Sequence, residues 1–212
     1  MEIMQGVIGV VIAWTVPKIL DYLLAKGRQE GGVGEDLTKR FPWIKWCVTL
    51  TIAGGTGGFL SGVLGLLGLK TPGGMGNWAI FGACLGIGQW IVLKRYDSFG
   101  SFWAVASALG WSVFSYFQVT KSSGYYGWLT AGLVVGILQW FLLRKGRNRA
   151  LFWIPANMLA WLIAGTLGFA VGVAMLNAKI KFATAWIIGW AIVGLIGSVI
   201  LGWALKRMPK KD

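Results

Sequence analysis

Residues 78–93 read WAIFGACLGIGQWIVL, and fifty residues later residues 128–143 read WLTAGLVVGILQWFLL. The match extends over residues 78–115 and 128–165, where 12 of 38 aligned positions are identical without a gap. Every Trp in one window has a counterpart in the other. A fixed period of this kind indicates duplication of one structural unit.

The repeated unit has the length of two membrane-crossing helices with short loops, since a span needs about 20 apolar residues. Of the 212 residues, 56% are hydrophobic and 13% are charged, whereas soluble domains carry about 25% charge. We therefore predict an all-α, polytopic membrane bundle of six to seven transmembrane helices built from helical hairpins. The predicted spans are 3–24, 46–69, 75–93, 100–119, 127–143, 151–176 and 182–205.

Weaker copies of the repeat flank the two matched windows. The pair Pro42-Trp43 resembles the Phe-Trp starts at 102–103 and 152–153, and residues 202–207 resemble the helix ends near 90 and 140. Because each unit holds two spans, the copies have the same orientation in the membrane. The predicted six-helix body, 43–207, therefore consists of three hairpins, 43–95, 100–145 and 150–207, followed by a cytoplasmic tail, 208–212.

The first segment, 1–24, stands outside this pattern. It is apolar up to Trp14, but Pro17, Lys18 and Asp21 interrupt its second half. Either it spans the membrane, which we favour and which gives seven helices, or it lies along the cytoplasmic surface as an amphipathic helix, which leaves six. The residues that follow, 25–42, read as a cytoplasmic linker.

The net charge of +13 could suggest nucleic acid, but the bases form short clusters between apolar runs, as loop charges do in membrane proteins. Counted over alternate connections, fifteen bases lie on one side and four on the other. The excess of bases marks the cytoplasmic side, so the C-terminus is predicted to be cytoplasmic. Two basic loops give candidate contacts for anionic lipids: Arg144, Lys145, Arg147, Arg149, Lys206 and Arg207.

Small residues recur at helical spacing on two faces of the span 46–69. Such faces let membrane helices approach closely. They are expected either to pack the helices of this chain together or to meet another membrane protein or a second copy. The candidate residues are Gly54, Gly58 and Gly62 on one face, and Gly57, Ser61 and Gly65 on the other.

Five residues inside the predicted spans are candidates for polar or ligand contacts. Gln89 and Gln139 each precede a basic pair, and they could anchor helix ends or converge in a polar pocket. Asn157 lies mid-helix and needs a hydrogen-bond partner in hydrocarbon. Trp111 and Trp161 occupy equivalent repeat positions, where they could fill the core or line a pocket for an apolar ligand.

The composition disfavours most chemistry. The chain has no His and two Cys, so the commonest general base and metal ligand is missing. No phosphate-binding loop, nucleophile elbow or helically spaced carboxylate pair appears. Ion-coupled carriers normally need an acidic or basic side chain inside the membrane, and no acid lies deep in the predicted six-helix body. We expect no catalytic residue, metal or cofactor, and no enzyme activity.

The pattern G-x-x-Q-W-x-x-L followed by a base, in its looser form at 86–94 and 136–144, resembles that of uncharacterised bacterial multi-pass membrane proteins, some of them from photosynthetic bacteria. The resemblance implies a bacterial inner membrane, or a thylakoid membrane in a photosynthetic source, and brings no activity. Two functions are expected from the residues. The first is an accessory, assembly or scaffold subunit that binds other membrane proteins, lipids or pigments. The alternative is a facilitator or binding component for a neutral or apolar small molecule.

Overall fold

The computed structural model describes residues 37–38, 41–66, 75–94, 96, 101–119 and 125–211. The predicted first segment, 1–24, and most of the linker, 25–42, lie outside the described residues.

The described elements are six α-helices and one short 3-10 helix, which confirms the all-α prediction. The bounds lie within a few residues of the predicted spans. The helices are α2 (Trp43–Leu66), α3 (Met75–Leu93), α4 (Phe102–Val119), α5 (Tyr125–Leu143), η2 (Ala150–Phe152), α6 (Trp153–Asn177) and α7 (Phe182–Lys206).

Two prolines lie at helix starts, where a missing N–H costs nothing. The carbonyl of Pro42 accepts the first helical hydrogen bond of α2, from the Trp46 amide at 2.9 Å. Pro155 occupies the first turn of α6, where backbone amides have no partner within the helix in any case. The predicted span 151–176 corresponds to η2 followed directly by α6.

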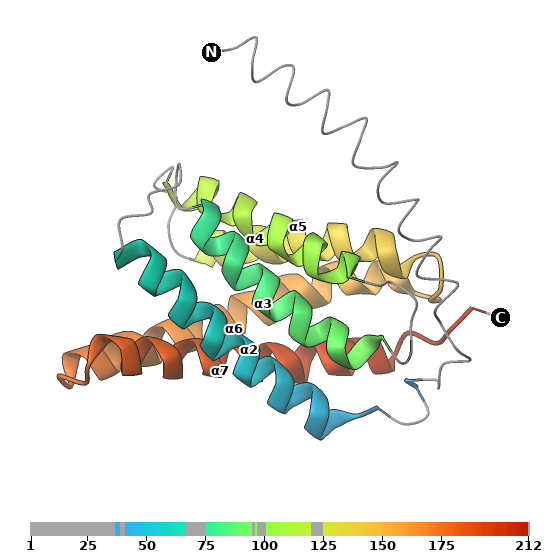
Figure 1. Ribbon diagram of the computed structural model, residues 1–212. Coiled ribbons are helices and arrows are strands. Elements are labelled where there is room, and N and C mark those ends of the chain that lie inside the picture. The colour runs from blue at the N-terminus through green and yellow to red at the C-terminus, as the bar shows by residue number, and fades with distance from the viewer. Residues whose placement is uncertain are drawn as a thin grey trace, which may run out of the picture.

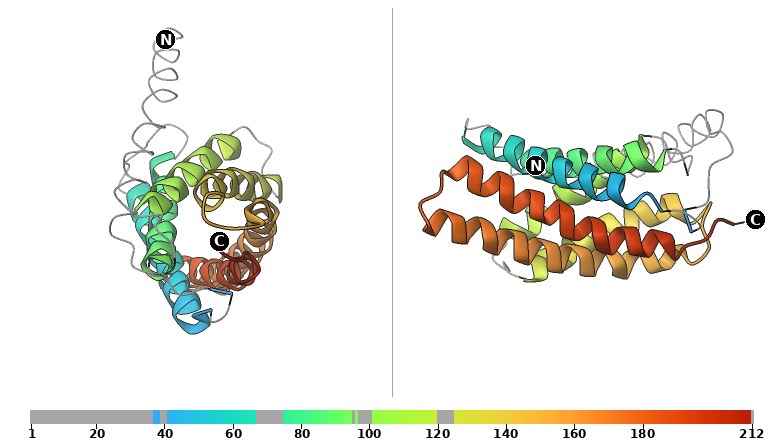
Figure 2. Two further views of the ribbon diagram at one scale, coloured as in Figure 1. Left: turned by 90° about the vertical axis from the view of Figure 1, so that its right-hand side faces the viewer. Right: turned by 90° about the horizontal axis from the view of Figure 1, so that it is seen from below.

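The helices form a closed ring in chain order. Each helix packs against the next along the chain, and α7 returns to pack against α2. The left view of Figure 2 looks down the axis of the ring, and Figure 1 shows that consecutive helices run in opposite directions. Helices α3, α5 and α7 therefore end near the C-terminus of the chain, at what we call the C-terminal end of the ring. The other extremity, where α7 begins, is called the far end.

Glycines close the ring between α2 and α7. A Cβ atom added to Gly194 would strike the Leu50 carbonyl oxygen, and one added to Gly54 would strike the Trp190 carbonyl oxygen. The Trp46 indole N–H donates to the Ser198 carbonyl across the same interface, at 2.7 Å. The two backbones lie this close because neither glycine carries a side chain.

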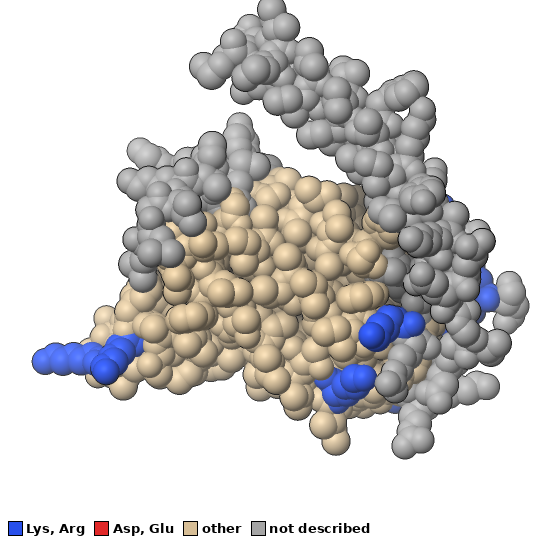
Figure 3. All heavy atoms as spheres, in the orientation of Figure 1, with Lys and Arg blue, Asp and Glu red and all other residues tan. Residues whose placement is uncertain are grey.

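The outside of the ring is apolar. Ile52 on α2, Leu109 on α4 and Leu159 on α6 are 63%, 47% and 53% exposed, and Figure 3 shows Lys and Arg only toward the two extremities of the coloured surface. Five of the helices, all but α4, are long and apolar enough to cross a membrane. In α4 the apolar stretch is shorter, Phe102–Phe114. The described structure is that of an integral membrane protein.

Candidate functional site

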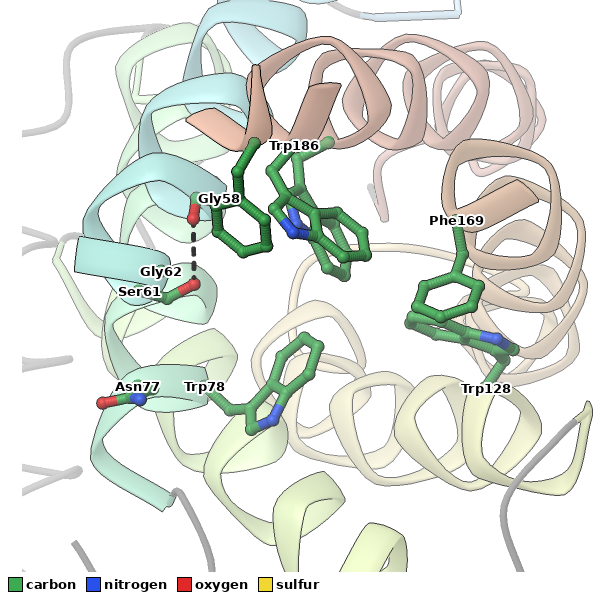
Figure 4. Close-up of a pocket in the computed structure, with 10 residues that line it drawn as sticks. Gly58, Ser61, Gly62, Asn77, Trp78, Trp128, Phe169 and Trp186 are labelled. Atoms are coloured by element: carbon green, nitrogen blue, oxygen red, sulfur yellow. Dashed lines mark hydrogen bonds between the residues drawn. The ribbon is translucent and has the colours of Figure 1, made fainter. Parts of the chain in front are cut away.

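The far end of the ring contains a partly open pocket of about 420 Å³, which we call the chamber. Its lining comes from the last turns of α2, the first turns of α3, α5 and α7, and the second half of α6. In Figure 4 the rings of Trp78, Trp128, Phe169 and Trp186 surround a common centre. The lining residues are Gly58, Ser61, Gly62, Asn77, Trp78, Trp128, Phe169, Phe182, Trp186 and Trp190.

Aromatic side chains dominate this lining, and none of the described residues that line the chamber is charged. The polar side chains are Ser61 and Asn77, and the Ser61 hydroxyl donates to the Gly58 carbonyl at 3.2 Å. A chamber of this kind can hold an uncharged molecule by contact with indole and phenyl faces. It offers a charged group no compensating partner.

The two glycines in the lining play different parts. A Cβ on Gly58 would strike the Trp190 ring, so the absence of a side chain at this position lets the indole pack against α2. At Gly62 an added Cβ would meet no atom within 4 Å. The absence of a side chain at Gly62 therefore leaves open space.

On the side of the chamber that faces the C-terminal end, aromatic side chains in contact with one another fill the ring. Trp78 lies parallel to Trp111 with ring centroids 5.8 Å apart, and Trp111 meets Trp161 edge-on at 5.0 Å. Phe114 stacks on Trp128 at 5.2 Å. Trp111 and Trp161 are fully or almost fully buried, so they form the floor beneath the chamber and do not line it.

The polar partners of these two floor residues differ. The Trp161 indole N–H donates to Asn157 Oδ1 at 3.0 Å, and the Asn157 amide in turn donates to the Trp153 carbonyl at 3.0 Å. Asn157 thus has the partners that its position in hydrocarbon requires. The Trp111 indole N–H is buried and makes no hydrogen bond.

Gln89 and Gln139 meet in the ring interior toward the C-terminal end. The Gln139 amide donates to Gln89 Oε1 at 3.0 Å and to the Ser107 hydroxyl at 2.9 Å. Each Gln also accepts an indole N–H, from Trp103 to Gln89 at 2.6 Å and from Trp153 to Gln139 at 2.9 Å. Both side chains are almost completely buried, so this amide network joins α3, α4, α5 and α6 as an internal brace.

Residues that lie fifty positions apart in the sequence make matched contacts. The bond from Trp103 to Gln89 has its counterpart, fifty residues on, in the bond from Trp153 to Gln139. A Cβ on Gly86 would meet Ala104 and Ser107, and a Cβ on Gly136 would meet Ile154 and Asn157. The α3–α4 and α5–α6 interfaces are therefore built from matched residues.

The two small-residue faces of α2 are used within the chain. Gly54 and Gly58 pack against α7, whereas Gly57 packs against Phe81 and Cys84 of α3. Ser61 and Gly62 line the chamber, and the surroundings of Gly65 lie outside the described contacts. The described glycines of these faces thus turn toward α3, α7 and the chamber.

Three bases at the C-terminal end, one after each of α3, α5 and α7, lie over an aromatic ring four residues earlier in the chain. Lys94 lies over Trp90 at 5.4 Å, Arg144 over Trp140 at 5.4 Å and Arg207 over Trp203 at 3.9 Å. Cation–π attraction of this kind holds each charge beside an indole. The predicted lipid contacts Arg144, Lys145, Arg149, Lys206 and Arg207 are all exposed.

Arg147 departs from the expected lipid contact. Its side chain is 1% exposed, and its guanidinium donates to the Met208 carbonyl at 2.8 Å. The chain after α7 folds back onto the loop after α5. There the backbone N–H of Asn148 donates to the Pro209 carbonyl at 2.8 Å, and the backbone N–H of Lys211 donates to the Gly146 carbonyl at 3.0 Å. Arg147 is thus a buried anchor for residues 208–211, and it is not available to a lipid headgroup.

The sequence did not indicate the chamber. Trp78, Trp128 and Trp186 lie near helix ends, where Trp is also typical of the membrane interface. The signal that could have separated the two roles is the Trp at equivalent repeat positions 78 and 128 together with the open position Gly62.

Among the described residues, no group of three His, Cys, Asp or Glu side chains could hold a metal ion. Comparison of the chain with protein-family models, curated proteins and solved structures found no match.

Proposed function

We propose that the protein is a non-enzymatic integral membrane protein that binds an uncharged, apolar molecule in the chamber at the far end of the ring. The observation that carries this proposal is the chamber itself, whose volume of about 420 Å³ lies within the range of about 300–1,000 Å³ of ligand sites. Its lining also has the usual composition of such sites, which is mostly aromatic with few polar groups.

The filled interior favours binding over conduction. Toward the C-terminal end, Trp111 packs against the chamber residues Trp78 and Trp128 and against Trp161. The amide network of Gln89 and Gln139 lies beyond these rings. A molecule that entered the chamber would therefore stop inside the ring. This supports the binding component, and not the facilitator, of the second function expected from the sequence.

An accessory or scaffold role has less support. It was expected from glycine faces that could meet another membrane protein, and the described glycines of those faces contact α3, α7 or the chamber. We therefore place ligand binding before association with other membrane proteins.

The chamber is tested by filling it. Ser61→Trp places an indole in the chamber, whereas Leu60→Trp, one residue earlier on the exposed side of α2, adds the same side chain outside it. Protein purified in mild detergent would be extracted and its bound small molecules counted by mass spectrometry. We expect the unmodified protein and Leu60→Trp to carry the same apolar molecule, and Ser61→Trp about tenfold less, as about 1.4 kcal/mol of lost affinity produces. Equal amounts in all three proteins would overturn the proposal.

We further propose that all six helices of the ring span the membrane, with the C-terminal end in the cytoplasm. Helix α4 is included because it packs between α3 and α5, and the orientation follows from the fifteen bases that the sequence places on one side.

Thiol labelling from one side of the membrane tests the orientation. Lys181 directly precedes α7 and Lys211 follows its last residue, so these two exposed side chains lie at opposite ends of the ring. A membrane-impermeant maleimide is expected to label Lys181→Cys in intact cells and Lys211→Cys only after permeabilisation. The unmodified chain corrects for labelling of Cys47 and Cys84, and the reverse pattern would contradict the orientation.

A further inference from the structure

A second cavity, of about 30 Å³, lies between α2 and α7 beside the chamber. It shares Gly58, Gly62, Phe182 and Trp186 with the chamber lining. These four residues therefore form a common wall of the two cavities.

The remaining lining of this cavity faces the outside of the ring. It consists of Phe59, Val63 and Ala183, which do not line the chamber. Phe59 is 41% exposed, and Ala183 is exposed as well. The small cavity thus lies between the chamber wall and the outer, apolar surface, and we call it the lateral opening.

The path of α2 and α7 explains why the opening exists. The two backbones touch at Gly54 and Gly194, yet two turns further along α2 a Cβ on Gly62 would meet nothing within 4 Å. The helices therefore separate toward the far end. Because Gly62 has no side chain, nothing from α2 fills the space that this separation creates.

The opening lies at a shallow level of the ring. Val63 precedes the end of α2 at Leu66 by three residues, which is about 4.5 Å along a helix axis, and Ala183 is the second residue of α7. This is the level at which a lipid chain begins below its headgroup. Lys179 and Lys181, both exposed in the turn before α7, lie next to it on the far side.

We propose that the chamber is loaded from the lipid phase through the lateral opening and that its occupant is the acyl chain of a membrane lipid. The opening is bordered by apolar side chains on a surface that faces hydrocarbon, and none of the described residues that line either cavity is charged. A chain that entered between α2 and α7 would stay in an apolar environment as the two helices part to admit it, while its headgroup stayed at the membrane surface beside the lysines. The inference rests on the proposed function, because it requires that the chamber holds an apolar ligand.

The rival route is axial, from the aqueous phase at the far end of the ring. The two routes differ in which substitutions slow the filling of the chamber. Val63→Trp and Ala183→Trp narrow the lateral opening from its two sides and leave the chamber lining unchanged, whereas Leu60→Trp adds an indole to the outer surface of α2 without lining either cavity.

The test follows a photoreactive lipid. The protein would be reconstituted in phosphatidylcholine vesicles, and a phosphatidylcholine that carries a diazirine in its acyl chain would then be added. Samples would be illuminated at intervals after the addition, and the labelled residues would be mapped. Label at Trp128, which is 8% exposed, reports the chamber, and label at Leu109, which is 47% exposed, reports bulk lipid. We expect Val63→Trp and Ala183→Trp each to slow chamber labelling about tenfold, which corresponds to a barrier higher by about 1.4 kcal/mol. In both narrowed variants the labelling of Leu109 should equal that of the unmodified protein. In Leu60→Trp the labelling of the chamber and that of Leu109 should both equal those of the unmodified protein.

The outcomes separate this inference from the function on which it rests. Chamber labelling that is equally fast in both narrowed variants overturns the lateral route and leaves the ligand-binding role standing. No chamber labelling of the unmodified protein, even after mixing with the probe in detergent, overturns both. Either narrowed variant is sufficient for the test if the other does not fold.

Discussion

Replacing Gly194 by alanine is expected to lower the free energy of unfolding by about 1–3 kcal/mol or more, the cost of overpacking a tight interface. The added Cβ would strike the Leu50 carbonyl oxygen and would lie 3.2 Å from the Thr51 Cα. Both contacts are with backbone, so no side chain can rotate away. The change separates α7 from α2 and opens the ring where its two ends meet.

The matched control for this prediction is Gly62→Ala, which adds the same methyl group in open space on α2. It should leave stability unchanged or raise it by about 0.5–1 kcal/mol, because alanine is the better helix former. Thermal or denaturant unfolding of both variants in the same detergent measures the difference. Equal stability of the two variants would show that α2 and α7 do not meet as closely as described.

Replacing Gln139 by leucine is expected to lower the free energy of unfolding by about 2 kcal/mol. Hydrogen bonds between membrane helices contribute on average about 0.6 and at most about 1.7 kcal/mol each, and this substitution affects three of them. The substitution removes the bonds to Gln89 and Ser107 and leaves the Trp153 indole N–H without its acceptor. The loss concerns four helices at once, because this amide joins α3 and α4 to α5 and α6.

A double-mutant cycle with Trp153→Phe separates the network from the packing of the individual side chains. Both single substitutions break the same bond, so the double variant should be less destabilised than their sum by about 1 kcal/mol, the coupling typical of residues in direct contact. Unfolding of the four proteins in one detergent gives the coupling energy. Strict additivity would contradict a direct bond between Gln139 and Trp153.

Much of the architecture can be predicted from local features of the sequence. Apolar runs of the right length predict the helices, and Pro42 and Pro155 fall at helix starts because a proline is tolerated there. Gln89 and Gln139 occupy matched positions of the predicted repeat, and a meeting of the two amides was one of the expected outcomes. Asn157, an amide in hydrocarbon, had to find a partner, and it has two.

The features that the sequence does not predict depend on contacts between distant segments. The bond from Trp46 to Ser198 joins residues 152 apart, and the ring closure that it marks leaves no local pattern. Arg147 resembles every other loop base until the C-terminal residues fold over it. The chamber is hidden for a different reason: a Trp at a helix end serves a membrane interface and a binding site equally well, so Trp78 and Trp186 carry no distinguishing signal.

An experimental density map of the protein in lipid nanodiscs tests the central claim most directly. We expect an elongated density that belongs to no protein atom, lying between the indoles of Trp78 and Trp186 and extending toward the gap beside Val63 and Ala183. In Ser61→Trp the introduced indole should occupy that space. A chamber in which the rings of Trp78, Trp128 and Trp186 close upon one another, with no room for a ligand, would contradict it.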